Sequence, residues 1–153
     1  MISGIPSLLR NPSFWSPCMG WLLAQLTKVL LNRIRSGRVD FQYLVSLGGM
    51  PSAHASMAAG LAASVGINAG FSSQVFATTL FFAAVVMFDA ATVRRAASLQ
   101  ARLLNDIVDE LFHEHRLSER KVAELLGHTR LEVLMGALMG TFMALLVNAY
   151  ASR

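Results

Sequence analysis

Four long apolar runs alternate with polar stretches along the chain. They cover residues 14–31, 51–70, 73–93 and 131–150. Each run is close to the roughly 17–25 residues that a membrane-spanning helix needs. The pattern therefore predicts an all-α, integral membrane bundle of about four transmembrane helices. We expect residues 1–153 to form a single membrane domain.

The segment between the last two runs has an amphipathic pattern instead. Between residues 96 and 127, charges occupy one helical face and apolar residues the other, and Ser118 and Gly127 would begin and end a second short helix. This pattern predicts a helical hairpin, inserted between two spans and lying at the cytoplasmic membrane surface. The apolar positions that recur at helical spacing are Leu99, Leu103, Ile107, Leu111 and Phe112.

Composition supports a protein of the bilayer. Hydrophobic residues make up 54% of the chain and charged residues only 14%, with a mean hydropathy of +0.51. Soluble domains are nearer about a quarter charged. The single cysteine, Cys18, excludes an internal disulfide, and four histidines without a cysteine cluster argue against a structural zinc site. Composition therefore gives no sign of a structural metal site, and we expect no cofactor.

The charges are distributed unevenly between the two predicted sides. All lysines and arginines except Arg10 and Arg153, and all nine acidic residues, fall on the side shared by the loops after the first and third runs. The positive-inside rule predicts that this face is cytoplasmic and that both termini lie on the opposite side. Because acidic residues are mixed with the basic ones, the face does not resemble a uniformly cationic nucleic-acid surface. We expect a membrane setting and no nucleic-acid partner.

Residues with useful chemistry gather at the same face, where the ends of four runs meet. Lysine and arginine neutralise the oxygens of a phosphate ester, one histidine can attack phosphorus, and another can protonate the leaving oxygen. Gly49 and the helix that follows would add backbone N–H donors. The gathered side chains are those of Lys28, Arg35, Ser52, His54, Asp89, Arg94, Arg95, His128 and Glu132.

These residues also have structural explanations. Lys28 would extend to the lipid headgroups, the arginines would serve as topology signals, and either histidine would cap or pack a helix. Asp89, inside an apolar run, needs a partner such as Arg94 or Arg95. Solvent exposure is expected for His113 and His115, and a packing stripe for Met135, Met139 and Met143.

Three motifs, in order, resemble those of the type-2 phosphatidic acid phosphatase and vanadium haloperoxidase superfamily. "KVLLNRIR" places Lys28 seven positions before Arg35, and "PSAH" ends at His54. In "GHTRLEVLMGALMG", Glu132 follows His128 by four positions. Together with "FDAATVRRAA", the pattern is similar to that of a small divergent branch of the superfamily, the acid phosphatase/haloperoxidase-related membrane proteins.

The motifs depart from the usual pattern at defined positions. Ser36 stands where a proline usually follows the arginine, Ala53 replaces a glycine, and Glu132 replaces an aspartate. An arginine usually precedes the histidine of the third motif by six residues, but Val122 occupies that position. The arginine pair after the third run is the expected substitute.

The resemblance implies a metal-independent lipid-phosphate phosphatase that works through a phosphohistidine. It implies that His128 is the nucleophile, that Glu132 holds the other ring nitrogen of His128, and that His54 is the general acid. The substrate would be a phosphate monoester or diphosphate of a lipid, of the phosphatidate, phosphatidylglycerophosphate or polyprenyl diphosphate type. The vanadate-binding members are soluble, so the membrane setting favours the phosphatase. The phosphate would be held by Lys28, Arg35, Gly49, Ser52 and one of Arg94 or Arg95.

A second hypothesis has no catalysis. The chain would bind anionic lipid headgroups or a protein partner through the same basic cleft. In either case a homodimer is one way to complete a bundle smaller than the six spans usual in related phosphatases. Gly136 and Gly140, at GxxxG spacing, are one candidate face for it.

Overall fold

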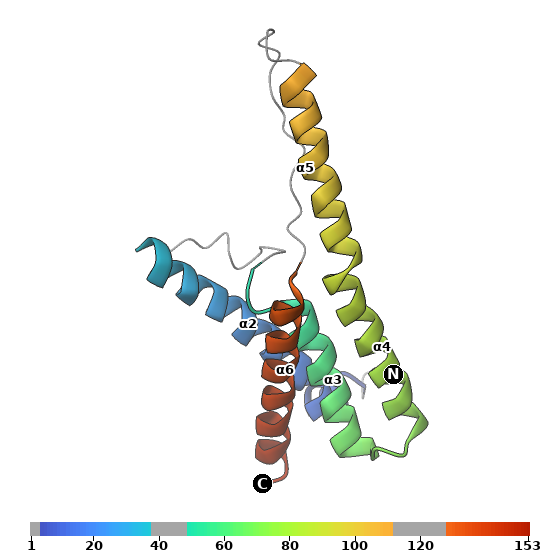
Figure 1. The fold of residues 1–153 in the computed structure, drawn as a ribbon. Helices are drawn as coiled ribbons and strands as arrows, with labels where there is room; N and C mark the ends of the chain where they lie inside the picture. The colour runs from blue at the N-terminus through green and yellow to red at the C-terminus, as the bar shows by residue number, and fades with distance from the viewer. Residues whose placement is uncertain (1–3, 38–48, 112–127) are drawn as a thin grey trace.

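The computed structural model describes residues 4–37, 49–111 and 128–153. All regular secondary structure in these ranges is α-helical, which confirms the all-α prediction for the described part of the chain. Figure 1 shows a bundle from which one long helical arm projects. The helices are α1 (Gly4–Leu9), α2 (Pro12–Ser36), α3 (Ala53–Ala69), α4 (Gln74–Ala91), α5 (Val93–Leu111) and α6 (Arg130–Ala151).

Close packing of α2, α3 and α6 forms the centre of the bundle. Small residues line these contacts, so the backbones approach closely, as is common between membrane helices. A Cβ atom on Gly140 would collide with the carbonyl oxygen of Ser56, and one on Gly136 with that of Ser52. Gly20 of α2 meets the same turn of α3, where its carbonyl oxygen accepts a 2.8 Å hydrogen bond from Ser56 Oγ. Three helices are thus held together at the level of Ser56.

These contacts change one expectation from the sequence. The GxxxG pair, Gly136 and Gly140, is buried against α3 of the same chain. Small residues at this spacing favour close helix packing, but the spacing does not say whether the partner helix belongs to the same molecule. The glycine face therefore packs against α3 within the chain, and a homodimer stays a prediction.

The order of the contacts gives the direction of each helix. Ser52, Ser56 and Ser64 of α3 meet Gly136, Gly140 and Asn148 of α6 at a constant offset in sequence, so α3 and α6 are parallel. Along α2 the order is reversed, because Ser13 meets Ser64 whereas Gly20 meets Ser56. As a result, the start of α2 and the end of α6 lie at one end of the bundle. The starts of α3 and α6 lie at the other.

A polar cluster joins the three helices near the first of these ends. Asn68 Nδ2 donates to Asn148 Oδ1 at 2.6 Å, and Asn148 Nδ2 donates to Ser64 Oγ at 2.9 Å. Ser13 Oγ lies 3.1 Å from Ser64 Oγ. Side-chain hydrogen bonds of this kind between helices favour a defined register.

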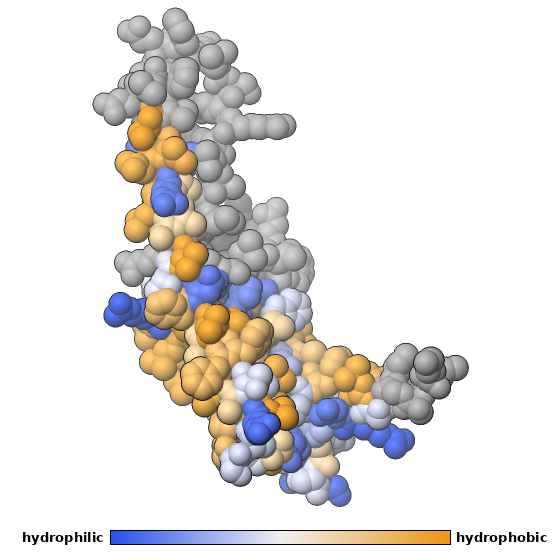
Figure 2. All heavy atoms as spheres, turned by 90° about the vertical axis from the view of Figure 1, so that its right-hand side faces the viewer, coloured by the Kyte–Doolittle hydropathy of each residue, from blue (hydrophilic) through white to orange (hydrophobic). Residues whose placement is uncertain are grey.

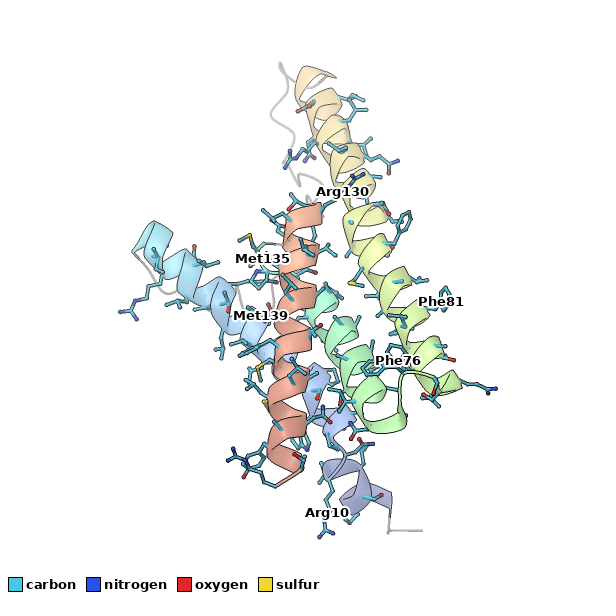
Figure 3. The ribbon with its side chains drawn as sticks, turned by 60° about the horizontal axis from the view of Figure 1, so that its bottom comes forward. Arg10, Phe76, Phe81, Arg130, Met135 and Met139 are labelled. Atoms are coloured by element: carbon cyan, nitrogen blue, oxygen red, sulfur yellow. The ribbon has the colours of Figure 1, made fainter. Side chains whose placement is uncertain are left out.

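Helix α4 packs on the outer side of α3 and presents an apolar surface outward. Phe76 points toward α3, where its ring lies against Gly66, while Phe81 points away from the bundle (Figure 3). Figure 2 shows apolar side chains gathered over α4. The most exposed of them are Val75, Phe81, Val85 and Phe88.

Within the described ranges, α4 and α6 are long and apolar enough to cross a membrane, at 18 and 22 residues. Helices also occupy the other two predicted spans, with α2 extending beyond residues 14–31 at both ends. That α2 and α3 cross the membrane as well stays a prediction.

The predicted surface hairpin is described only in its first arm. Helix α5 begins at Val93, directly after Thr92, and continues close to the direction of α4 (Figure 1). Its apolar positions Leu99, Leu103 and Ile107 are exposed, in agreement with the amphipathic pattern. The rest of the hairpin lies outside the described residues, including the predicted cap Ser118 and stop Gly127, Phe112, Val122, and the histidines His113 and His115.

Candidate functional site

The helix starts of α3 and α6 are joined by a backbone hydrogen bond. Ser52, the N-cap of α3, donates its amide to the carbonyl oxygen of Glu132 at 3.0 Å, and its hydroxyl oxygen accepts from Ala55 N at 3.3 Å. Ser52 is fully buried. These contacts give Ser52 a structural role in joining two of the sequence motifs. Donation from its hydroxyl to a phosphate remains a prediction.

Glu132 is fixed by the first turn of its own helix. Thr129, the N-cap of α6, accepts from Glu132 N through Oγ1 at 3.3 Å, and Glu132 Oε2 accepts from Thr129 N at 3.0 Å. This reciprocal arrangement is a capping box, which satisfies two backbone donors at a helix start. The carboxylate is therefore held in position by the fold before any ligand is considered.

The same carboxylate oxygen reaches the ring of His128. His128 Nδ1 lies 3.1 Å from Glu132 Oε2, with the His128 side chain fully buried and that of Glu132 20% exposed. An ionised carboxylate only accepts hydrogen bonds, so Nδ1 carries the proton and donates it. In a neutral imidazole the lone pair then lies on Nε2. This is the arrangement in which carboxylates orient catalytic histidines.

Helix α4 also contacts the segment that leads into α6. The backbone amide of His128 donates to the carbonyl oxygen of Ala90 at 3.3 Å. The last turn of α4 thus lies beside His128, as expected from the sequence. Asp89, next to Ala90, is partly buried.

Lys28 of α2 is buried at the same end of the bundle, with 4% of its surface exposed. Its ammonium group interacts electrostatically with the Glu132 carboxylate. This burial disfavours the alternative in which Lys28 extends to the lipid headgroups. A cation, a carboxylate and a histidine are consequently brought together from α2 and from the start of α6.

His54 lies in the first turn of α3, two residues after Ser52, and is partly exposed. It is thus at the same end of the bundle as His128, on a neighbouring helix. We refer to Lys28, Ser52, His54, His128 and Glu132 as the candidate site.

The remaining predicted phosphate ligands are placed by their backbones. Gly49 is exposed and has φ +87°, a left-handed conformation that favours glycine. Arg35 follows Lys28 by two turns of α2, and Arg94 and Arg95 lie in the first turn of α5. The side chains of these three arginines are outside the described part, so their contacts with the candidate site remain predictions.

The sequence analysis did not single out two residues that lie near the candidate site, Thr129 and Gln25. The role of Thr129 as a helix cap could have been predicted, because Thr-x-x-Glu before an apolar run is the capping-box signature. Gln25, one turn before Lys28, is buried, and its Oε1 accepts no hydrogen bond within the described structure. A glutamine in an apolar run carries no signal that distinguishes a buried from an interfacial position.

Comparison with known proteins identifies the family of the chain. The chain is 34% identical to the "Uncharacterized membrane protein YuiD" of Bacillus subtilis (strain 168), over 92% of this chain and 96% of that protein. No solved structure matches the chain. The family model described as "Divergent PAP2 family" matches residues 9–143, which include every residue of the candidate site. With its histidine, carboxylate and lysine gathered at one end of a helical bundle, the chain belongs to the divergent PAP2 family of membrane proteins.

Proposed function

We propose that this protein hydrolyses a phosphate monoester or diphosphate carried by a membrane lipid. The observation that carries the proposal is the buried His128, held at Nδ1 by Glu132 at 3.1 Å and accompanied by the buried Lys28. A lysine buried near the predicted nucleophile is suited to neutralising the oxygens of a phosphate. Family membership supports the same class of chemistry.

The first step would form a phosphohistidine. His128 Nε2 attacks phosphorus with its lone pair while the bond from phosphorus to the leaving oxygen breaks. Glu132 stabilises the positive charge that develops on the ring, since its carboxylate accepts a hydrogen bond from the Nδ1–H group. His54 donates a proton to the departing alcohol or phosphate.

The second step would return the enzyme to its starting state. His54, now neutral, accepts a proton from a water molecule as the water oxygen attacks phosphorus. The bond between phosphorus and Nε2 breaks, releasing inorganic phosphate and restoring neutral His128. Lys28 would neutralise charge on the non-bridging oxygens throughout, together with Arg35 and one of Arg94 or Arg95.

The membrane setting argues for a lipid substrate. The candidate site lies at the start of α6, an apolar helix long enough to span a bilayer. A phosphate headgroup would reach the site from the membrane surface while its tail stays among the lipids. By the positive-inside rule that surface is cytoplasmic.

Phosphate release is the test. Purified, detergent-solubilised protein would be given phosphatidate, phosphatidylglycerophosphate and a polyprenyl diphosphate in the presence of EDTA. We expect metal-independent release from at least one substrate, and none from a His128→Ala sample prepared in parallel. Acid-labile phosphate on the wild-type protein, absent from the variant, would identify the intermediate.

Two results would count against the proposal. Release that persists in His128→Ala would assign the activity to a contaminant or to another residue. No release from any substrate, with retained binding of vanadate or inorganic phosphate, would favour a protein that binds anionic headgroups without hydrolysing them.

A further inference from the structure

A groove lies between the start of α2 and the end of α6, at the end of the bundle opposite the candidate site. Its volume is about 680 Å³ and its lining is mainly apolar. Met19 and Met143 lie closer to the middle of α2 and α6. Tyr150 lies at the end of α6, and Arg10 lies in the turn before α2. The lining residues are Leu9, Arg10, Pro12, Trp15, Met19, Met143, Leu146, Val147, Tyr150 and Ala151.

The turn between α1 and α2 holds Arg10 at this groove. Trp15 Nε1 donates to the carbonyl oxygen of Leu9 at 2.7 Å, which ties α1 to the first turn of α2. Arg10 N donates to Ser7 O at 3.3 Å, and Asn11 caps α2 by accepting from Ser13 N at 2.9 Å. The backbone on both sides of Arg10 is therefore fixed by hydrogen bonds.

The charge at this end is uncompensated by acidic residues. None of the nine aspartates and glutamates falls in residues 1–37 or 133–153, the segments that meet there. Arg10 and Arg153 are the only cations predicted for this side of the membrane. Figure 3 shows Arg10 at the opposite end of the bundle from Arg130, which adjoins the candidate site.

We propose that this groove binds one anionic phospholipid from the leaflet at that end. An acyl chain lies along the methionines and aliphatic residues of α2 and α6. The lipid phosphate pairs with the Arg10 guanidinium. Trp15 and Tyr150 sit at headgroup depth, where aromatic residues gather in membrane proteins. The inference is independent of the proposed phosphatase function, because the groove and the candidate site lie at opposite ends of the bundle.

Lipid binding to the purified protein tests the proposal. The probes are dioleoyl-phosphatidylglycerol and its zwitterionic counterpart dioleoyl-phosphatidylcholine, counted on the protein by native mass spectrometry. A fixed low concentration of inorganic phosphate in every sample competes for the candidate site. We expect one phosphatidylglycerol to bind in preference to phosphatidylcholine. Arg10→Gln should weaken that binding about five- to tenfold, since one basic residue near a membrane surface contributes roughly 1 kcal/mol.

Arg153→Gln is the matched control, because it removes one cation from the same end without altering the groove lining. It should keep the preference for phosphatidylglycerol. Val147→Trp, which fills the groove but retains Arg10, should weaken the binding of both lipids. A wild-type protein without headgroup preference, an equal loss in both arginine variants, or unchanged binding in Val147→Trp would each overturn the proposal.

Discussion

The backbone amide of Ser52 donates a 3.0 Å hydrogen bond to the carbonyl oxygen of Glu132. This bond connects "PSAH" to "GHTRLEV", two motifs that are far apart in sequence. It also sets the start of α3 beside the start of α6, which brings His54 and His128 to the same end of the bundle. This interhelical contact therefore helps to position the proposed acid and the proposed nucleophile.

Glu132→Gln should lower kcat while the protein stays folded. The amide can present a donor to Nδ1 and favour the wrong tautomer of His128, a change that costs on the order of 10²–10⁴ where a carboxylate orients a catalytic histidine. Thr129→Ala is the control, because it weakens the same capping box without removing the carboxylate. It should cost about 1 kcal/mol of stability and keep kcat near the wild-type value. Wild-type turnover in Glu132→Gln would exclude this role.

Lys28→Met should lower the phosphatase rate without lowering the thermal stability of the protein. Methionine keeps a long, unbranched side chain in the buried space, and burying an ammonium group is costly, so thermal stability should be retained. Phosphatase rates should fall on the order of 10²–10³, as for the loss of one electrostatic donor at a transition state. Equal activity in wild type and variant, at saturating lipid phosphate, would place Lys28 outside the site.

His54→Ala should affect substrates unequally. A poor leaving group such as a lipid alkoxide needs a proton, whereas a nitrophenolate departs without one. We expect a large loss of turnover on lipid phosphate and a small one on nitrophenyl phosphate. Comparable losses on both substrates would argue against His54 as the general acid.

Part of this site was predictable because its spacing is local. Glu132 follows His128 by only four positions, and the resemblance to the superfamily motif implied the contact between them. The burial of Lys28 was not predictable in the same way, because a lysine near a helix end has the same local pattern whether it faces headgroups or protein. The positions of Arg35, Arg94 and Arg95 relative to the candidate site depend on loop and helix directions, which periodicity does not encode.

For the fold, too, the sequence predicted local features such as helix positions, but not which helices pack together. Apolar length predicted the positions of α2, α3, α4 and α6, with boundaries within a few residues for the last three. The six-residue helix α1 was not predicted, since it is too short to show a periodic pattern. The spacing of Gly136 and Gly140 predicted close packing, but only the three-dimensional structure identifies α3 as the partner.

Gly140→Ala should destabilise the bundle. The added methyl group would collide with the backbone oxygen of Ser56, which cannot move without separating α3 from α6. Overpacking of this kind costs about 1–3 kcal/mol or more. Thermal unfolding followed by circular dichroism in detergent would measure the loss. Leu138→Ala, on the exposed side of the same helix, should cost much less, and an equal loss would contradict the packing described.

Asn148→Leu should weaken the polar cluster at the far end. It removes the hydrogen bonds to Ser64 and Asn68, for an expected cost of about 1–2 kcal/mol. Thr141→Val is the control, because the hydrogen bond that Thr141 Oγ1 makes in the described part of the chain goes to Ala137 O of its own helix. Unfolding midpoints that fall equally in the two variants would show that the cluster adds no interhelical stability.

The constant offset between α3 and α6 has a consequence for distant variants. A slip of one residue between these helices would move His128 and Glu132 by about 1.5 Å relative to Ser52 and would set side chains against the wrong small residues. Sixteen positions separate Glu132 from Asn148, or about 24 Å of helix, yet both belong to the same rigid alignment. The asparagines at one end of the bundle therefore fix the alignment of the candidate site at the other end. A substitution far from the candidate site can change its geometry by shifting one helix along its neighbour.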